Sequence, residues 1–372
     1  MDLYIDREEL IRGLSRVQGI VERRTTNIAL SHVMLSAEGN LLRMTATDTM
    51  VSLVADYVAR VEQPGEISVD AQNLFQVARS LPEPTVHLKA EAGNRLAITS
   101  GKSEFHLVGM SGEDYPPLPS RDDNAALGVP GTTLHRLIVE TLYAVCVDDS
   151  RYGLNGAHLE EITSENGEAR LRMVTTDGSR LSYAESAYTG EFNMGRRMLL
   201  PRKALDEVRK LCDGDDSDWN IAFGERSATF ETSGLTMMVR LVDGEFPDYR
   251  QVLPPAYKRR MELERSDFLD ALKRVSIVAS DRNHSVRFGF ESNQLVLSAQ
   301  QVDLGNAREE VVANLDGEGF DTGFNIAYFI DIMRHTSGEK LVLEMGDPLD
   351  PCIVRIPDRD DCLFVVMPIR LD

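Results

Sequence analysis

The sequence is poor in residues that form disulfides, bind metals or cross membranes. Its four cysteines do not form a CxxC pair, and its seven histidines have no metal-ligand spacing. We therefore expect reduced, inert thiols, with no metal and no cofactor. No stretch approaches the roughly 18 apolar residues that span a bilayer, and the first residues lack the basic and apolar regions of a signal peptide. These absences predict a cytoplasmic protein. The cysteines are Cys146, Cys212, Cys352 and Cys362.

Catalytic motifs are also missing. The chain has no GxGxxG, GxxxxGK, GxSxG or HExxH pattern. Asp177 could suggest a catalytic carboxylate, but it precedes Gly178 in a turn signal, and Asp48 stands at the equivalent place in an earlier segment. We predict a structural role for both aspartates. The acidic runs 213–218 and 358–361 lack the calcium-loop pattern and are interpreted as solvated turns.

Basic residues are outnumbered, which argues against a simple nucleic-acid-binding protein. The 40 Lys and Arg face 60 Asp and Glu, for a net charge of −20. The predicted helical stretches nevertheless carry a net +5, and the rest of the chain carries −25. Basic helices within an acidic shell would suit a protein whose helices face a polyanion. The alternative is that these charges are simply solvated. The stretches are 7–24, 71–81, 132–146, 201–212, 264–280 and 325–336.

What the sequence does contain is a long repeat. Leu10, Leu134 and Phe268 occupy equivalent places in three amphipathic segments, and each segment is followed by a strand-like phrase and a second helix. A period near 125 residues corresponds to whole domains rather than to a solenoid. The pattern predicts an α+β fold with more antiparallel strands than helices. We predict domains at 1–124, 125–256 and 257–372, joined by stiff proline-containing connectors at 114–119 and 246–255.

Four phrases are distinctive enough to indicate a family. They are RYGLNG at 151–156, TDGSRL at 176–181, LVDGEFPDYR at 241–250 and VVMPIRL at 365–371. Together they resemble the bacterial DNA sliding clamp, the beta subunit of DNA polymerase III, from end to end. The resemblance implies three tandem similar domains of the DNA-clamp type, with helices lining a central hole and antiparallel sheets outside. It also implies a head-to-tail homodimer that forms a six-domain ring.

The function that the resemblance implies is that of a non-catalytic DNA polymerase processivity factor. Such a ring encircles double-stranded DNA without sequence specificity. It tethers the replicative DNA polymerase, and the clamp loader, repair polymerases and other clamp-motif proteins bind the same hydrophobic pocket. A ring that must slide needs sequence-blind phosphate contacts rather than base readout.

Site residues follow from the resemblance, position by position. The DNA contacts would be Arg24, Arg79, Tyr152, Arg202 and Lys203. The peptide pocket would comprise Leu154, Thr176, Gly178, Ser179, Arg180, Leu181, Pro247, Gln251, Val252, Val365, Val366, Met367, Pro368, Ile369 and Arg370. The dimer interface would place Lys102, Phe105 and Leu107 opposite Ile277, Val278, Glu309 and Glu310.

The chain departs from the family pattern at four positions. Gly153 stands where a second aromatic is common, Ser179 where some members have histidine, and Gln251 where some have arginine. Asp372 follows the usual Arg-Leu ending. The glycine weakens the expected DNA contact of the 151–156 loop, the serine and glutamine would shift peptide preference, and Asp372 would add a charge close to the pocket.

Two other classes of function remain as alternatives. A hydrolase or transferase built from repeated domains would need a convergent nucleophile or acid/base set, and the sequence offers none. A scaffold that only collects peptide-bearing partners would keep the C-terminal pocket but would not need basic helices. The +5 balance on the helical stretches argues against that scaffold.

Overall fold

The computed structural model describes residues 1–119, 126–148, 150–164, 166–190, 198–279 and 284–371. The polar run at 120–124, the predicted boundary at 124/125 and Asp372 lie outside the described residues. Within them, no helix is long and apolar enough to cross a membrane. The four cysteines are free and buried.

The first third of the chain alternates strands and helices in the predicted order. It contains β1 (Asp2–Asp6), α1 (Arg7–Val17), β2 (His32–Glu38), β3 (Leu41–Thr47), β4 (Val51–Gln63), β5 (Gly65–Asp70), α2 (Ala71–Ser80), β6 (Thr85–Glu91), β7 (Arg95–Ser100) and β8 (Ser103–Met110).

The same order recurs twice, which confirms the predicted repeat. The second pass contains β9 (Ala126–Pro130), α3 (Gly131–Leu142), β10 (Gly156–Thr163), β11 (Ala169–Thr176), β12 (Arg180–Ser186), β13 (Thr189–Gly190), β14 (Met198–Pro201), α4 (Arg202–Leu211), β15 (Asp218–Phe223), β16 (Ser227–Thr232) and β17 (Leu235–Arg240). The third contains β18 (Arg259–Glu264), α5 (Arg265–Ser276), β19 (Ser285–Glu291), β20 (Gln294–Gln301), β21 (Gly305–Asp316), β22 (Phe320–Asn325), α6 (Ile326–His335), β23 (Lys340–Met345), β24 (Cys352–Arg355) and β25 (Cys362–Val366). Within the described residues, the short β13 is the one addition to this order.

Helix α2 begins at its predicted cap, but three helix ends were predicted wrongly. Asp70 caps α2 as expected, because its Oδ1 accepts a hydrogen bond from Asn73 N at 2.8 Å. Helix α1 ends at Val17 instead of residue 24. The chain turns at Gly19, which packs close to the Glu207 side chain, and then buries Ile20 and Val21 in the core. Helices α3 and α5 likewise end at Leu142 and Ser276, short of the predicted 146 and 280.

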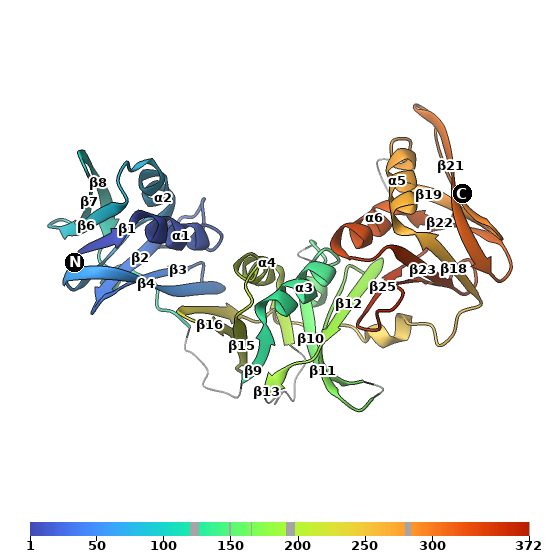
Figure 1. Cartoon of the computed structure of the whole chain (residues 1–372), viewed down its shortest axis with the longest axis horizontal. Coiled ribbons are helices and arrows are strands. Elements are labelled where there is room, and N and C mark those ends of the chain that lie inside the picture. The colour runs from blue at the N-terminus through green and yellow to red at the C-terminus, as the bar shows by residue number, and fades with distance from the viewer. Residues whose placement is uncertain (120–125, 149, 165, 191–197, 280–283, 372) are drawn as a thin grey trace. The chain divides into compact units, whose positions relative to one another are not determined.

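The first of two compact units comprises Met1–Thr132, Thr189–Met194 and Lys203–Leu241. Its 13 strands form one sheet in the order β1-β6-β7-β8-β5-β2-β3-β4-β17-β16-β15-β9-β13, and β1 also pairs with β4. Antiparallel pairing of β4 with β17 makes the sheet continuous between the first repeat and part of the second. Helices α1 and α2 lie side by side on this sheet (Figure 1), and Leu10 and Leu14 of α1 are fully buried.

The second unit comprises Thr133–Tyr188, Gly195–Arg202 and Val242–Asp372. Its 12 strands run β14-β10-β11-β12-β25-β24-β23-β18-β21-β20-β19-β22. Strands β12 and β25 pair antiparallel, with Leu181 opposite Val365. Helices α5 and α6 pack together, and Phe268 of α5 meets Phe329 of α6 edge to face at 5.9 Å. The β12–β25 pairing brings the last strand of the chain against the central repeat.

Candidate functional site

A cavity of about 220 Å³ lies where β12 meets β25 in the second unit. Its walls come from the short helix Tyr152–Leu154, the β11–β12 turn, the short helix Tyr249–Val252 and the end of the chain. Nine of the predicted pocket residues line it: Leu154, Thr176, Gly178, Arg180, Leu181, Pro247, Val252, Val365 and Met367. Segments more than 200 residues apart therefore form one apolar hollow, the kind of site that takes an apolar side chain from a ligand.

The β11–β12 turn shapes one wall through its own hydrogen bonds. Asp177 Oδ1 accepts from Ser179 N at 2.9 Å and from Arg180 N at 3.1 Å, and Gly178 adopts φ +89°. Asp48 Oδ1 does the same in the first repeat, accepting from Met50 N at 2.8 Å. The structural role predicted for both aspartates is confirmed.

Arg180 makes three hydrogen bonds beside the cavity and is not available as an unpaired charge. Its Nε donates to Asp177 at 3.0 Å, its Nη1 to Asp331 at 2.6 Å and its Nη2 to the Tyr143 carbonyl at 2.7 Å. Burial acts to lower the pKa of Arg180, but the hydrogen bond to Asp331 and the nearby carboxylates raise it on balance. The guanidinium therefore stays charged and is already paired with two carboxylates.

Two lining residues, Asp248 and Tyr249, were not predicted. Tyr249 is 3% exposed, and its hydroxyl donates to Glu160 at 2.5 Å and accepts from Arg172 at 2.7 Å. Burial raises the pKa of Tyr249 to about 12. The 246–255 segment, predicted as a connector that also supplies Pro247, Gln251 and Val252 to the pocket, is thus tied to the sheet through Tyr249. Its two aromatics, of which Phe246 is 2% exposed, were the available signal.

Six predicted pocket residues do not line the cavity: Ser179, Gln251, Val366, Pro368, Ile369 and Arg370. Val366 is fully buried, and because side chains alternate along β25 it lies on the face opposite to its cavity-lining neighbour Val365. The backbone after β25 instead fixes the C-terminal segment, since Met367 N donates to Ser179 O at 2.9 Å and Ile369 N to Gly323 O at 2.8 Å.

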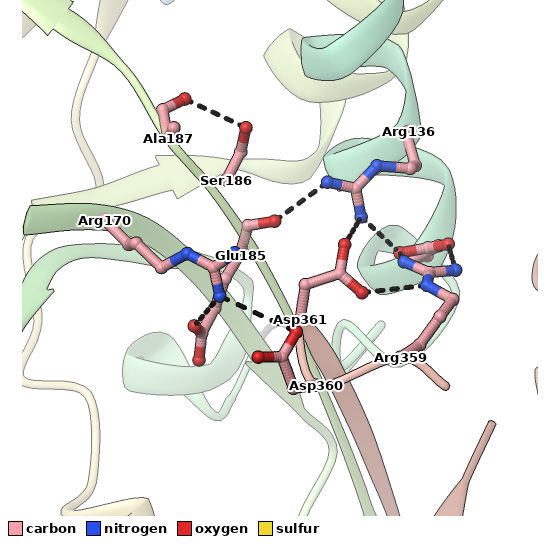
Figure 2. Close-up of polar contacts among 9 residues, drawn as sticks. Arg136, Arg170, Glu185, Ser186, Ala187, Arg359, Asp360 and Asp361 are labelled. Carbon is pink, nitrogen blue, oxygen red and sulfur yellow. Dashed lines mark hydrogen bonds and ion pairs between the residues drawn. The ribbon is translucent and has the colours of Figure 1, made fainter. Parts of the chain in front are cut away.

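A network of charged residues fixes the loop that leads into β25 (Figure 2). Arg136 of α3 donates to the Glu185 carbonyl at 2.8 Å and lies 3.0 Å from Asp361. Arg359 lies 2.6 Å from Glu140, and both of these side chains are at most 20% exposed. The network therefore joins α3, β12 and the loop before β25 around largely buried ion pairs.

The predicted DNA contacts differ in whether a carboxylate of the same chain neutralises them. Arg24, Arg79 and Arg202 are exposed, and Tyr152 is 70% exposed. Lys203 instead donates to Asp48 at 2.5 Å and to the Ile20 carbonyl at 2.9 Å. Its charge is shared with a carboxylate of the first repeat, so its attraction for a phosphate is reduced.

Gly153 occupies a position where its packing allows no side chain. An added Cβ would lie 2.5 Å from the Glu245 carbonyl oxygen. The 152–154 helix thus packs closely against the segment that precedes the cavity wall. The departure from an aromatic at this position is therefore matched by the local packing of this chain.

Four predicted interface residues, Phe105, Leu107, Glu309 and Glu310, lie on strands with an open edge in the described residues. Lys102 lies in the turn before β8, and Ile277 and Val278 directly follow α5. Residues 103–108 of β8 pair only with β7, because β5 takes up only residues 109 and 110. Residues 305–312 of β21 pair only with β20, and the rest of β21 turns to β18. Phe105 is 37% exposed and Ile277 is 74% exposed. Glu309 is paired with Arg274 at 2.8 Å, and Glu310 with Arg308.

Family models for the DNA polymerase III beta subunit match nearly the whole chain. The N-terminal domain model matches residues 1–119, the central domain model 128–248 and the C-terminal domain model 250–370. The beta sliding clamps of Caulobacter vibrioides and Pseudomonas aeruginosa are each 32% identical, with the whole of both chains covered.

Solved clamp structures match equally fully. The Caulobacter crescentus clamp, which carries a polyethylene glycol at its beta-motif tethering region, is 32% identical with a TM-score of 0.93 over the whole of both chains. The Bartonella birtlesii clamp bound to griselimycin is 31% identical with a TM-score of 0.94, again over both whole chains. The chain belongs to the DNA polymerase III beta-subunit family, the bacterial DNA sliding clamps. It is therefore a processivity factor, an accessory protein rather than an enzyme.

Proposed function

We propose that two copies of the chain close head to tail into a six-domain ring around duplex DNA. The open edges of β8 and β21 carry this proposal, because an unpaired strand edge is a template for pairing with another chain. Phe105 and Leu107 of one copy would pack against Ile277 and Val278 of the other. Lys102 would approach Glu309 and Glu310 at the rim. A contact between two different surfaces closes into a ring when its rotation allows.

DNA would be held loosely by Arg24, Arg79, Tyr152, Arg202 and Lys203, without sequence specificity. Three exposed guanidinium groups and one ammonium group that is shared with Asp48 support this assignment, because a few phosphate contacts hold DNA without fixing its position. The chain's net charge of −20 disfavours binding elsewhere on its surface. Loose contact suits a ring that must slide.

The cavity would receive short linear motifs of the replicative polymerase, the clamp loader, repair polymerases and other clamp-motif proteins. Its aliphatic and methionine walls support this role, because such side chains adapt to several apolar anchors. Ser179, Gln251, Val366, Pro368, Ile369 and Arg370 would act around the cavity rather than in it. We propose domains at 1–124, 125–256 and 257–372, and a cytoplasmic location, where the chromosome of a bacterium lies.

Primer extension on a singly primed circular template, with cognate polymerase, clamp loader and ATP, tests this function. Phe105→Asp should abolish long products by opening the interface, and Met367→Asp should abolish them by blocking the cavity. Val58→Asp is the matched control, because Val58 is 75% exposed on β4, a strand that contributes no residue to the predicted interface or to the cavity lining. Long products from all three variants would contradict the proposal.

A further inference from the structure

Almost every cation close to the cavity is already paired with a carboxylate, and this pairing bears on which peptides the cavity accepts. Arg180 faces both Asp177 at 3.0 Å and Asp331 at 2.6 Å. One positive charge there meets two negative charges. Arg151 contacts the same turn, where its Nη1 donates a hydrogen bond to the Asp177 carbonyl at 2.6 Å.

Carboxylates also outnumber cations at the wall that contains Asp248. Arg250 donates to Glu160 at 2.8 Å and lies 4.0 Å from Asp248, so one guanidinium again serves two carboxylates. Burial acts to raise the pKa of Glu160, but hydrogen bonds from His158, Tyr249 and Arg250 lower it to about 2. Glu160 is therefore ionised at neutral pH and keeps Arg250 engaged.

Asp248 is the carboxylate left available to a ligand. It lines the cavity and is 43% exposed, and its nearest hydrogen-bond donor is the neutral amide of Gln251 at 3.3 Å. Asp243 and Glu245 precede it on the same segment and are exposed. The nearest side-chain donor to Asp248 is thus an uncharged amide, so Asp248 lacks a close, dedicated cation.

We infer that the cavity prefers partner peptides with a basic residue beside their apolar anchors, and that Asp248 and Gln251 set this preference. The inference rests on the proposed peptide-binding function of the cavity. A lysine or arginine of the peptide would neutralise Asp248, because Arg250 is already engaged by Glu160. A glutamate at the same place would be repelled by Asp248. Specificity of this kind comes as much from repelling the wrong partner as from attracting the right one.

The test uses the full chain and three synthetic peptides with the same leucine and phenylalanine anchors and a flanking Lys, Ala or Glu. Affinities are measured by fluorescence anisotropy at low and high salt. For one charge near a solvated carboxylate, we expect the Lys peptide to bind about threefold to tenfold more tightly than the Glu peptide at low salt. The ratio should fall as salt rises.

Three variants separate this effect from general electrostatics. Asp248→Asn should bring the ratio close to one, and Gln251→Arg should lower or reverse it by adding a cation beside Asp248. Asp316→Asn removes an exposed carboxylate at the end of β21, away from the cavity lining, and should leave the ratio unchanged.

The outcomes distinguish this inference from the proposed function. Equal affinities for the Lys and Glu peptides, or a ratio that Asp248→Asn leaves unchanged, would overturn the basic preference while peptide binding itself stands. If none of the three peptides binds, the proposed function of the cavity fails, and the inference fails with it.

Discussion

Arg359 and Glu140 meet through two hydrogen bonds although 219 residues separate them in the sequence. Arg359 Nη1 lies 2.6 Å from Glu140 Oε1, and Arg359 Nη2 lies 3.1 Å from Glu140 Oε2. The Glu140 side chain is 4% exposed. Arg359 belongs to the loop that leads into β25, and Glu140 belongs to α3. This pair therefore anchors the strand that contributes Val365 to the cavity.

Removing the Arg359 side chain should destabilise the protein strongly. Arg359→Gln would leave the Glu140 carboxylate buried beside only Arg136, and a buried ion pair broken on one side costs about 3 kcal/mol. The free energy of unfolding from urea denaturation measures this loss. Arg287→Gln is the control, because the Arg287–Asp321 pair is more than half exposed and should contribute at most about 0.5 kcal/mol. Equal losses in the two variants would show that the buried pair has no special role.

Glu160 should make stability depend on pH in the acidic range. Burial opposes its ionisation, but its hydrogen bonds lower its folded pKa to about 2, below the unfolded value of about 4.3. A carboxyl with a lowered folded pKa stabilises the protein above its unfolded pKa, and this contribution is lost as pH falls toward the folded pKa. The difference in unfolding free energy between wild type and Glu160→Gln should therefore be constant above about pH 5 and shrink between about pH 4.3 and 2. A difference that does not vary with pH would refute this assignment.

Lys203 should contribute to stability as well as to DNA binding. Lys203→Met would leave Asp48, which is 8% exposed, without its cation, and we expect the unfolding free energy to fall by about 1–2 kcal/mol. Arg202→Met, at the exposed neighbouring position, should change stability by less than about 0.5 kcal/mol. In a double-mutant cycle, Asp48→Asn and Lys203→Met should be non-additive. Additive effects would mean that the contact between Asp48 and Lys203 does not contribute to stability.

The close packing of Gly153 predicts that an aromatic residue at this position will destabilise the protein. Gly153→Tyr would force the 152–154 helix away from the Glu245 carbonyl, at a cost of about 1–3 kcal/mol. Leu154 lines the cavity and would move with it, so affinity for the leucine- and phenylalanine-anchored peptides, measured by fluorescence anisotropy, should also fall. Tyr152→Ala is the control, since that side chain is largely exposed and should leave the unfolding free energy nearly unchanged. A stable Gly153→Tyr variant with unchanged affinity would contradict this packing argument.

Local sequence signals predicted the fold well and the site in part. The threefold order of elements, the Asp70 cap and the aspartate turns follow from periodicity and turn chemistry, which are local. The ends of α1, α3 and α5 were missed, because burial of the following segment is a tertiary effect; after α1, for example, the chain turns and buries Ile20 and Val21. The Asp48 contact of Lys203 was missed for a similar reason, since it joins residues 155 positions apart. Resemblance supplied the cavity residues, but only three-dimensional contacts identify Asp248 and Tyr249 as members of its wall.

The central claim is that the protein holds DNA by encircling it, and retention on DNA tests this most directly. The clamp would be loaded onto a nicked circular plasmid by a cognate clamp loader and ATP, and the amount bound would be followed by gel filtration before and after cutting at one site. The account predicts stable retention on the circle and rapid loss once free ends are available. Equal retention on circular and linear DNA, or equal loss from both, would contradict a sliding ring.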